Sequence, residues 1–239
     1  MQNCQETIDK ISKDESHRVA MYVDGFNLYY PISELGQPHL KWLNLWAVAE
    51  MLSANLEHGP LQKVVFCTAF PKRNIDKKIR HERYVEALEA HGEHVDLGHH
   101  LIREHVCLGE CKSVTEVEAE KQTDINVALS LYQDAHDNVF DYAYLVSADS
   151  DQAATAYFLK KHFPDKKLIS VAPPKRDHSN KLLSRADGKV KIDEIVLKAC
   201  RLPEIILPSP PTIMKAIRCP DEYKMPASLV ASTHKNALT

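Results

Sequence analysis

Two aspartates stand one residue apart in the stretch LVSADSD, directly after an apolar run. These are Asp149 and Asp151, and carboxylates this close repel each other unless a cation compensates them. Asp24 likewise ends the apolar run RVAMYVD, and Asp124 lies in EKQTDINVAL. Carboxylate oxygens without thiolate or imidazole partners suit Mg²⁺ or Mn²⁺. Because such an ion can orient water and stabilise charge on a phosphodiester, the predicted chemistry is hydrolysis at phosphorus.

Two expected strands would bring most of these acids together. The apolar runs at 18–24 and 140–148 read as short buried strands. In an open parallel sheet, ligands bind outside the carboxyl ends of the strands. If these two strands are neighbours, Asp24 meets Asp149 and Asp151 at one edge of the sheet.

A helix would supply the fourth carboxylate. Residues 118–136 have apolar residues at helical spacing: Ile125, Leu129 and Tyr132 fall along one side, with Ala128 and Leu131 beside them. This helix precedes the 140–148 strand and must run antiparallel to it. Its amino end therefore lies at the carboxyl edge of the sheet, and we expect it to deliver Asp124, together with Glu120, to the same place.

Each acid also has an ordinary structural role open to it. Asp24 followed by glycine is typical of a turn, and Asp151 could be a helix N-cap. Asp124 could be a first-turn acid favoured by the helix dipole. The Asp149–Asp151 pair also fits the nucleotide-sugar metal motif of a DxD-type transferase. The convergence of three separate segments favours the catalytic interpretation.

The whole chain alternates between expected strands and helices, which predicts βαβ units. We therefore expect a three-layer α/β/α fold with a mostly parallel central sheet, followed by a Pro-rich C-terminal tail. The predicted divisions are an N-terminal extension (1–17), one α/β domain (18–202) and the tail (203–239). Strands are expected at 18–24, 62–70, 93–102, 140–148 and 166–174, and helices at 40–56, 72–92, 118–136 and 151–163.

Three motifs, in this order, resemble those of the NYN domain family, a branch of the PIN-like, metal-dependent nuclease superfamily. They are VDGFNLYY (23–30), EKQTDINVAL (120–129) and LVSADSD (145–151). With the later stretch 170–192, the resemblance spans roughly residues 18–200. It implies a PIN-like fold and an endonucleolytic ribonuclease that uses Mg²⁺ or Mn²⁺. A non-catalytic RNA-binding or adaptor module that keeps the acidic site is the alternative.

The resemblance also implies roles for individual residues. The aspartates would be the metal ligands, and they share the catalytic role with an asparagine that adds no charge to a crowded anionic site. Ala148 stands where the family's signature has glycine. The matching residues are Asp24 and Asn27 in the first motif, Asp124 in the second, and Ser147, Asp149 and Asp151 in the third.

Basic and polar residues near the same edge are candidates for holding the nucleic-acid backbone. Their alternative is a solvated surface. Tyr29 and Tyr30 could stack on a base, although packing within the domain is the expected role for them. The predicted substrate-binding residues are Asn27, Lys121, Ser147, Lys175 and Arg176.

A cluster of histidines and cysteines begins inside the expected 93–102 strand and continues toward the 118–136 helix. His99, His100 and His105 precede Cys107 and Cys111. A Cys-x₃-Cys pair could contribute to a zinc site, which needs four ligands in a tetrahedron. Because the spacing is irregular and there is no second cysteine pair, we expect a loop with reduced thiols. A structural Zn²⁺ at Cys107 and Cys111 is the alternative.

Composition limits the partners. The formal net charge is −3, from 30 Lys and Arg against 33 Asp and Glu. This balance argues against a polybasic DNA-coating protein but permits a local basic rim. No apolar run reaches the roughly 18 residues that cross a bilayer, and six scattered cysteines do not suggest a disulfide scaffold. We expect a cytoplasmic protein with RNA as partner and no membrane contact; DNA as a substrate and a homodimer stay open.

Overall fold

In the computed structural model, the described residues are 17–107, 109, 111–207 and 216–227. Within that part of the chain, a six-stranded parallel sheet has the order β3-β2-β1-β6-β7-β8. This confirms the predicted α/β fold with a parallel central sheet. Its strands are β1 (Val19–Asp24), β2 (Leu61–Thr68), β3 (His94–Leu97), β6 (Tyr142–Val146), β7 (Lys167–Ala172) and β8 (Gly188–Lys191).

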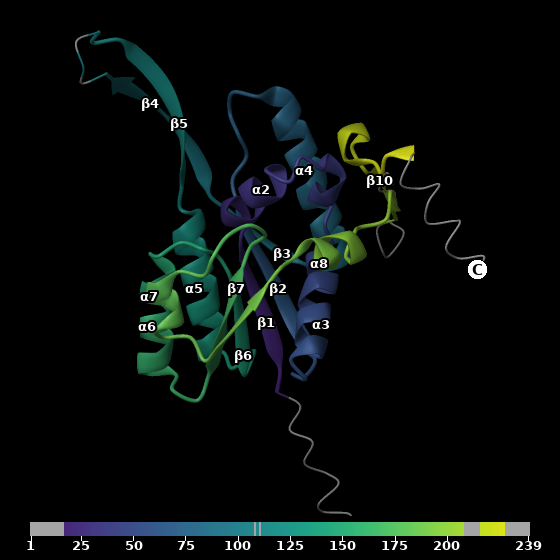
Figure 1. Cartoon of the computed structure of the whole chain (residues 1–239), viewed down its shortest axis with the longest axis vertical. Helices are drawn as coiled ribbons and strands as arrows, with labels where there is room; N and C mark the ends of the chain where they lie inside the picture. Colours follow the sequence, from purple (N-terminus) through teal and green to yellow (C-terminus); the bar gives the residue numbers. More distant parts are fainter. Residues whose placement is uncertain (1–16, 108, 110, 208–215, 228–239) are drawn as a thin grey trace, which may run out of the picture.

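Helices cover both faces of the sheet, as Figure 1 shows. One face carries α3 (Leu45–Asn55), α4 (Ile75–His91) and α8 (Glu194–Ala199), and the other carries α5 (Thr123–His136), α6 (Gln152–His162) and α7 (Asn180–Leu183). A further helix, α2 (Gly25–Ser33), follows β1 directly and lies over the carboxyl ends of the strands (Figure 1). The sheet therefore has an open edge at which loops and helix ends meet.

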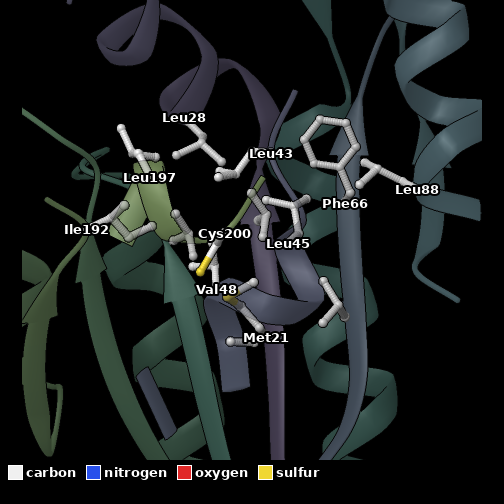
Figure 2. Packing of buried hydrophobic residues seen from close by; sticks show 14 of the residues in the cluster. Met21, Leu28, Leu43, Leu45, Val48, Phe66, Leu88, Ile192, Leu197 and Cys200 are labelled. Atoms are coloured by element: carbon white, nitrogen blue, oxygen red, sulfur yellow. The ribbon is translucent and has the colours of Figure 1, made fainter. Parts of the chain in front are cut away.

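Successive side chains of β1 point alternately into the two hydrophobic cores, one on each face of the sheet. Met21 and Val23 belong to the core beneath α3, α4 and α8, whereas Ala20 and Tyr22 belong to the core beneath α5 and α6. Figure 2 shows Met21 with its neighbours in the first core. Burying a large apolar side chain of this kind contributes roughly 1.5–3 kcal/mol. These two cores fix β1 at the centre of the molecule and so fix Asp24 at its end.

The predicted strand at 93–102 is in fact two strands in different sheets. β3 is the last part of this segment that pairs with the central sheet. β4 (His99–Val106) instead pairs antiparallel with β5 (Val114–Lys121). The break falls at Gly98, where an added Cβ would lie 2.5 Å from the carbonyl oxygen of Lys121. The β4–β5 hairpin projects from the sheet as a long arm (Figure 1). The expected loop around the cysteines thus lies at the far end of a hairpin.

The predicted helix at 118–136 begins later than expected. Residues 118–121 belong to β5, and α5 starts at Thr123. Gln122 between them has a φ of 79°, a left-handed conformation that turns the chain sharply from strand to helix.

The expected apolar side of this helix is correct only for Leu131, which is buried. Ile125 and Leu129 are exposed, and the buried stripe that faces the sheet contains Val127, Leu131 and Ala135. The two stripes lie on nearly opposite sides of the helix, because Val127 and Leu131 each follow Ile125 and Leu129 by two residues, a rotation of about 200°. Both sides carry apolar residues, so apolar spacing alone did not show which side faces the sheet.

Part of the C-terminal segment packs against the domain. A short antiparallel pair, β9 (Ile205–Ile206) with β10 (Ile217–Arg218), leads to a 3-10 turn, η2 (Asp221–Tyr223). Tyr223 is buried in the first core, and its carbonyl oxygen accepts a hydrogen bond from Arg201 at 3.0 Å. The division at residue 203 stays a prediction. Among the described residues, no helix is long and apolar enough to span a membrane.

Candidate active site

The candidate site lies where the order of strands reverses. The chain moves from β1 to β2 and β3 on one side and from β6 to β7 and β8 on the other. Such a switch point is where an open parallel sheet binds its ligands. β1 and β6 pair in parallel, with Val23 opposite Val146. This confirms the expected neighbourhood of the two strands, so Asp24 and Ser147 follow side by side at one edge.

Asp24 is held firmly in place at this edge. Its Oδ1 accepts hydrogen bonds from the backbone N–H groups of Phe26 at 3.2 Å and Asn27 at 3.0 Å, which caps the amino end of α2. Asp24 therefore has a structural role in addition to its predicted chemical one. Only 4 % of the residue is exposed.

The electrostatic surroundings of Asp24 disfavour its charge. Burial raises the pKa of this carboxyl, hydrogen bonds from Asn27 lower it, and the nearby charges of Glu120 and Asp149 raise it again. A cation bound at this edge would stabilise a buried carboxylate beside two other acids.

Asn27 links the two halves of the edge. Its Nδ2 donates to Oδ2 of Asp24 at 2.6 Å, and its Oδ1 accepts from the backbone N–H of Ala148 at 3.3 Å. The amide therefore spans from the end of β1 to the loop after β6 without adding charge. Asp24, and not Asn27, holds the N-cap position of α2.

The loop after β6 is shaped by its own side chains. Ser147 is fully buried, and its Oγ accepts from the N–H of Asp149 at 3.1 Å. Oδ1 of Asp149 in turn accepts from the N–H of Asp151 at 2.9 Å. Asp151 occupies the N-cap position of α6, but its exposed side chain makes no capping hydrogen bond. Ser147 thus positions Asp149, and the substrate contact expected of Ser147 stays a prediction.

The amino ends of α5 and α6 are joined at the same edge. The side chain of Gln152 donates to the carbonyl oxygen of Asp124 at 3.1 Å. Asp124 itself is an exposed acid in the first turn of α5, as its structural alternative expected. The sequence motifs did not identify Gln152 as a site residue. Its buried amide is a part of the site that apolar patterning could not reveal.

Glu120 reaches the edge from β5 and not from a helix. Its Oε1 accepts from the N–H of Thr123 at 2.8 Å, which supplies the cap that Gln122 does not provide for α5. Its negative charge also contributes to the raised pKa of Asp24. The arm therefore contributes the Glu120 carboxylate to the site.

The donors at this edge are of the right chemical type for a hard divalent cation. They are carboxylate and amide oxygens, without thiolate or imidazole, which suits Mg²⁺ or Mn²⁺. In the described ranges, no three His, Cys, Asp or Glu side chains are arranged to hold a metal ion. The metal-ligand set Asp24, Asp124, Asp149 and Asp151 therefore stays a prediction, as does zinc at Cys107 and Cys111.

The expected basic residues lie at different places. Arg176 forms an ion pair with Glu34 just beyond α2, and the Lys175 Nζ donates to the carbonyl oxygen of Glu34 at 3.3 Å. Lys121 ends β5 opposite His99. Lys175 and Arg176 are thus anchored to the end of α2, whereas Lys121 belongs to the base of the arm.

Comparison with known proteins identifies the family. The NYN domain model matches residues 18–193, which include β1, α5 and the loop after β6. The chain is 26% identical over 237 residues to "6-hydroxy-3-succinoylpyridine 3-monooxygenase HspA" of Pseudomonas putida (strain DSM 28022 / S16), with 83% of this chain and 74% of that protein covered. A crystal structure of a protein of unknown function, VPA0982 from Vibrio parahaemolyticus RIMD 2210633, is similar with a TM-score of 0.48 and 19% identity, over 77% of this chain and 97% of that one. The chain belongs to the NYN domain family, a PIN-like family of nucleases.

Proposed function

We propose that this protein is a metal-dependent endoribonuclease that hydrolyses RNA phosphodiester bonds at the edge formed by its aspartates. The observation that carries the proposal is the buried carboxylate of Asp24, which lies beside Glu120 and Asp149 with a raised pKa. A charge in this position is destabilising for the protein alone and becomes favourable when a divalent cation is bound. The family match supports a nucleic acid as the substrate.

Asp24, Asp124, Asp149 and Asp151 would hold Mg²⁺ or Mn²⁺ through oxygen ligands. When bound, the ion supplies an activated water and stabilises the charge that develops on the phosphate. The side chains of the protein provide the orientation. Asn27 fixes the Asp24 carboxylate against the loop after β6.

Substrate positioning would come from basic residues at the same side of the sheet. Lys121 stands one residue after Glu120, and Lys175 and Arg176 follow β7. Because Arg176 is paired with Glu34, a phosphate would compete with a carboxylate for the guanidinium. This arrangement favours a strand of nucleic acid over a single phosphate ion, since several weak contacts must act together.

A cleavage assay tests the proposal directly. A fluorescent single-stranded RNA, a hairpin RNA and the DNA version of the first would be incubated with protein and Mn²⁺, Mg²⁺ or EDTA. We expect RNA cleavage in Mn²⁺ or Mg²⁺ and none in EDTA. Cleavage that persists in EDTA, or an absence of cleavage with every substrate, would contradict the proposal.

A non-catalytic RNA-binding or adaptor module is the second candidate. It is favoured by one observation, that no three potential ligands among the described residues are arranged around a common point. RNA binding with no cleavage in Mn²⁺ would support it. The assay above therefore decides between the two functions.

The name of the Pseudomonas relative introduces an activity of a different class, the monooxygenation of 6-hydroxy-3-succinoylpyridine. An oxygen electrode would record oxygen uptake when this protein is mixed with that compound and a nicotinamide reductant. We expect no uptake. Uptake that depends on the compound would replace the nuclease proposal with an oxygenase one.

A further inference from the structure

A small pocket lies beside the acidic edge, on the opposite side of α2 from Asn27. Its enclosed volume is about 50 Å³, so it can admit part of one ring and cannot enclose a large cofactor. Most of its surface is aromatic or aliphatic, and no acidic side chain lines it. Its lining includes Phe26 and Tyr29 of α2, Lys41 of η1 (Pro38–Lys41), Lys77 and His81 of α4, and His100 of β4.

Two lysines bring positive charge to this apolar pocket. The ammonium groups of Lys41 and Lys77 lie 4.7 and 4.8 Å from the centre of the Tyr29 ring. The Lys41 Nζ donates to Ser33 Oγ at 3.0 Å and contacts Tyr29 OH at 3.4 Å, both of which are neutral. Neither ammonium forms an ion pair with a carboxylate in the described part of the chain.

This charge is only partly compensated. Burial lowers the pKa of Lys41, and the nearby Arg80 lowers it further. Cation–π contacts stabilise an ammonium less than a carboxylate partner would at close range. An anion that enters the pocket would therefore find two positive groups with little to displace.

The histidines add polar groups of two kinds. His81 is hydrogen-bonded to Thr68 at 3.0 Å, and burial lowers its pKa to about 4, so it is neutral at pH 7. His100 is 7 % exposed and packs edge-on against Phe26, with 5.6 Å between the ring centres. Its Nδ1 lies 3.3 Å from Oε1 of Glu118, and its Nε2 has no hydrogen-bond partner among the described residues. A buried polar atom left in this state is destabilising unless a bound group satisfies it.

We propose that this pocket receives one edge of a planar ring that carries an anionic group. The ring packs against Phe26 and Tyr29, the anion pairs with Lys41 and Lys77, and a polar ring atom reaches His100. Two sources share this chemistry, a pyrimidine nucleotide of a nucleic acid and a free aromatic carboxylate. The site is separate from the aspartates, and binding there requires neither a metal nor cleavage.

Calorimetric titration of the metal-free protein tests the inference. Uridine 5′-monophosphate and nicotinate represent the two sources, and uridine and inorganic phosphate each represent one half of the recognition. We expect saturable binding of at least one of the first two, about tenfold or more tighter than uridine or phosphate. Binding of the nucleotide alone assigns the nucleic-acid source, and binding of nicotinate alone assigns the free acid. If neither binds, the inference is wrong.

Substitution of the lysines locates the site. Lys41→Met and Lys77→Met should each weaken binding about tenfold or more, which corresponds to about 1.4 kcal/mol. Lys78→Met is the matched control, because the adjacent Lys78 is paired with Glu82 at 3.5 Å and does not line the pocket. Circular dichroism would establish that each variant is folded. Wild-type affinity in both Lys41→Met and Lys77→Met would overturn the assignment, whatever the RNA assay gives.

Discussion

Asp24 combines two demands that oppose each other. As the N-cap of α2 it must accept two backbone hydrogen bonds, which favours an ionised carboxylate. As a buried group next to Glu120 and Asp149 it is disfavoured in that same form. The protein keeps the carboxylate in position through Asn27, whose amide bridges to Ala148. The position of the Asp24 carboxylate is thus fixed although its charge is locally destabilising. This is common at sites where a bound ligand supplies the compensating charge.

The substitution Asp149→Asn separates chemistry from stability. The asparagine Oδ1 can still accept from the N–H of Asp151, and the loss of one negative charge relieves repulsion with Asp24. We expect RNA cleavage in Mn²⁺ to disappear while the melting temperature stays the same or rises. Thermal unfolding and the cleavage assay measure the two effects.

Asp165→Asn is the control, because this exposed aspartate lies between α6 and β7, at the amino end of the strands. It should change neither quantity. A large loss of stability in Asp149→Asn would instead assign Asp149 a structural role.

At the scale of elements, the sheet could be predicted and the arm could not. β1 and β6 are short apolar runs buried on both faces, so their composition alone identifies them. The β5 sequence VTEVEAEK ends in Glu, Ala and Lys, which favour helix in isolation. Pairing with β4 overrides this preference, and most of the side chains of the hairpin stay exposed on both sides. No periodicity marks such a hairpin, so Glu120 was assigned to the wrong element.

The contact between α2 and β2 leaves no room for a side chain at Gly25. An added Cβ would lie 2.7 Å from the carbonyl oxygen of Cys67 and 2.9 Å from the Phe66 ring. Gly25→Ala should therefore push α2 away from the sheet, lower the free energy of unfolding by about 1–3 kcal/mol and impair cleavage by displacing Asn27. Urea unfolding and the cleavage assay measure both effects.

Gly36→Ala is the comparison for this prediction. Nothing lies within 4 Å of the added Cβ there, although the φ of +67° disfavours alanine. This variant should lose about 1 kcal/mol of stability through its backbone and keep full cleavage. If Gly25→Ala behaves in the same way, the close packing of α2 does not position the site.

A buried glutamate links the start of β3 to α3 and makes stability depend on pH. Oε1 of Glu93 accepts from the N–H of Trp46 at 3.1 Å. Burial raises the Glu93 pKa from 4.5 to about 7, although the backbone hydrogen bonds lower it. Between these two values the unfolded chain has released this proton and the folded chain still holds it. Stability should therefore fall as pH rises from about 4.5 to about 7, by at most about 3 kcal/mol, and stay level above that range.

Glu93→Gln should remove this part of the pH dependence, because glutamine does not titrate. Urea unfolding at pH 5 and pH 8, at one ionic strength, would compare the variant with the wild type. Glu89→Gln is the control, since Glu89 is exposed near the end of α4. If the free energy of unfolding changes equally between pH 5 and pH 8 in the wild type and in Glu93→Gln, Glu93 does not titrate in this range.

At the scale of the whole molecule, the central sheet is tied to α5 by a buried polar network as well as by apolar packing. Tyr22 OH on β1 donates to Oδ2 of Asp134 at 2.9 Å, and the Lys63 Nζ on β2 lies 2.8 Å from Oδ1. Tyr22 is fully buried and Asp134 is 5 % exposed. Burial raises the pKa of Tyr22, with the Asp134 charge as the next cause. The network therefore holds the helix that carries Asp124 against the strand that carries Asp24.

Removal of the shared carboxylate should be far more destabilising than removal of the hydroxyl. Asp134→Ala leaves the Tyr22 hydroxyl and the Lys63 ammonium without their partner, which we expect to lower the free energy of unfolding by about 3–5 kcal/mol. Tyr22→Phe removes one hydrogen bond and keeps the ion pair, at about 1 kcal/mol. Because both changes act on one contact, the double variant should lose less than the sum of the two single variants. Strict additivity in urea unfolding would mean that Tyr22 and Asp134 are not coupled, and that the Tyr22 hydroxyl does not help to hold α5 on the sheet.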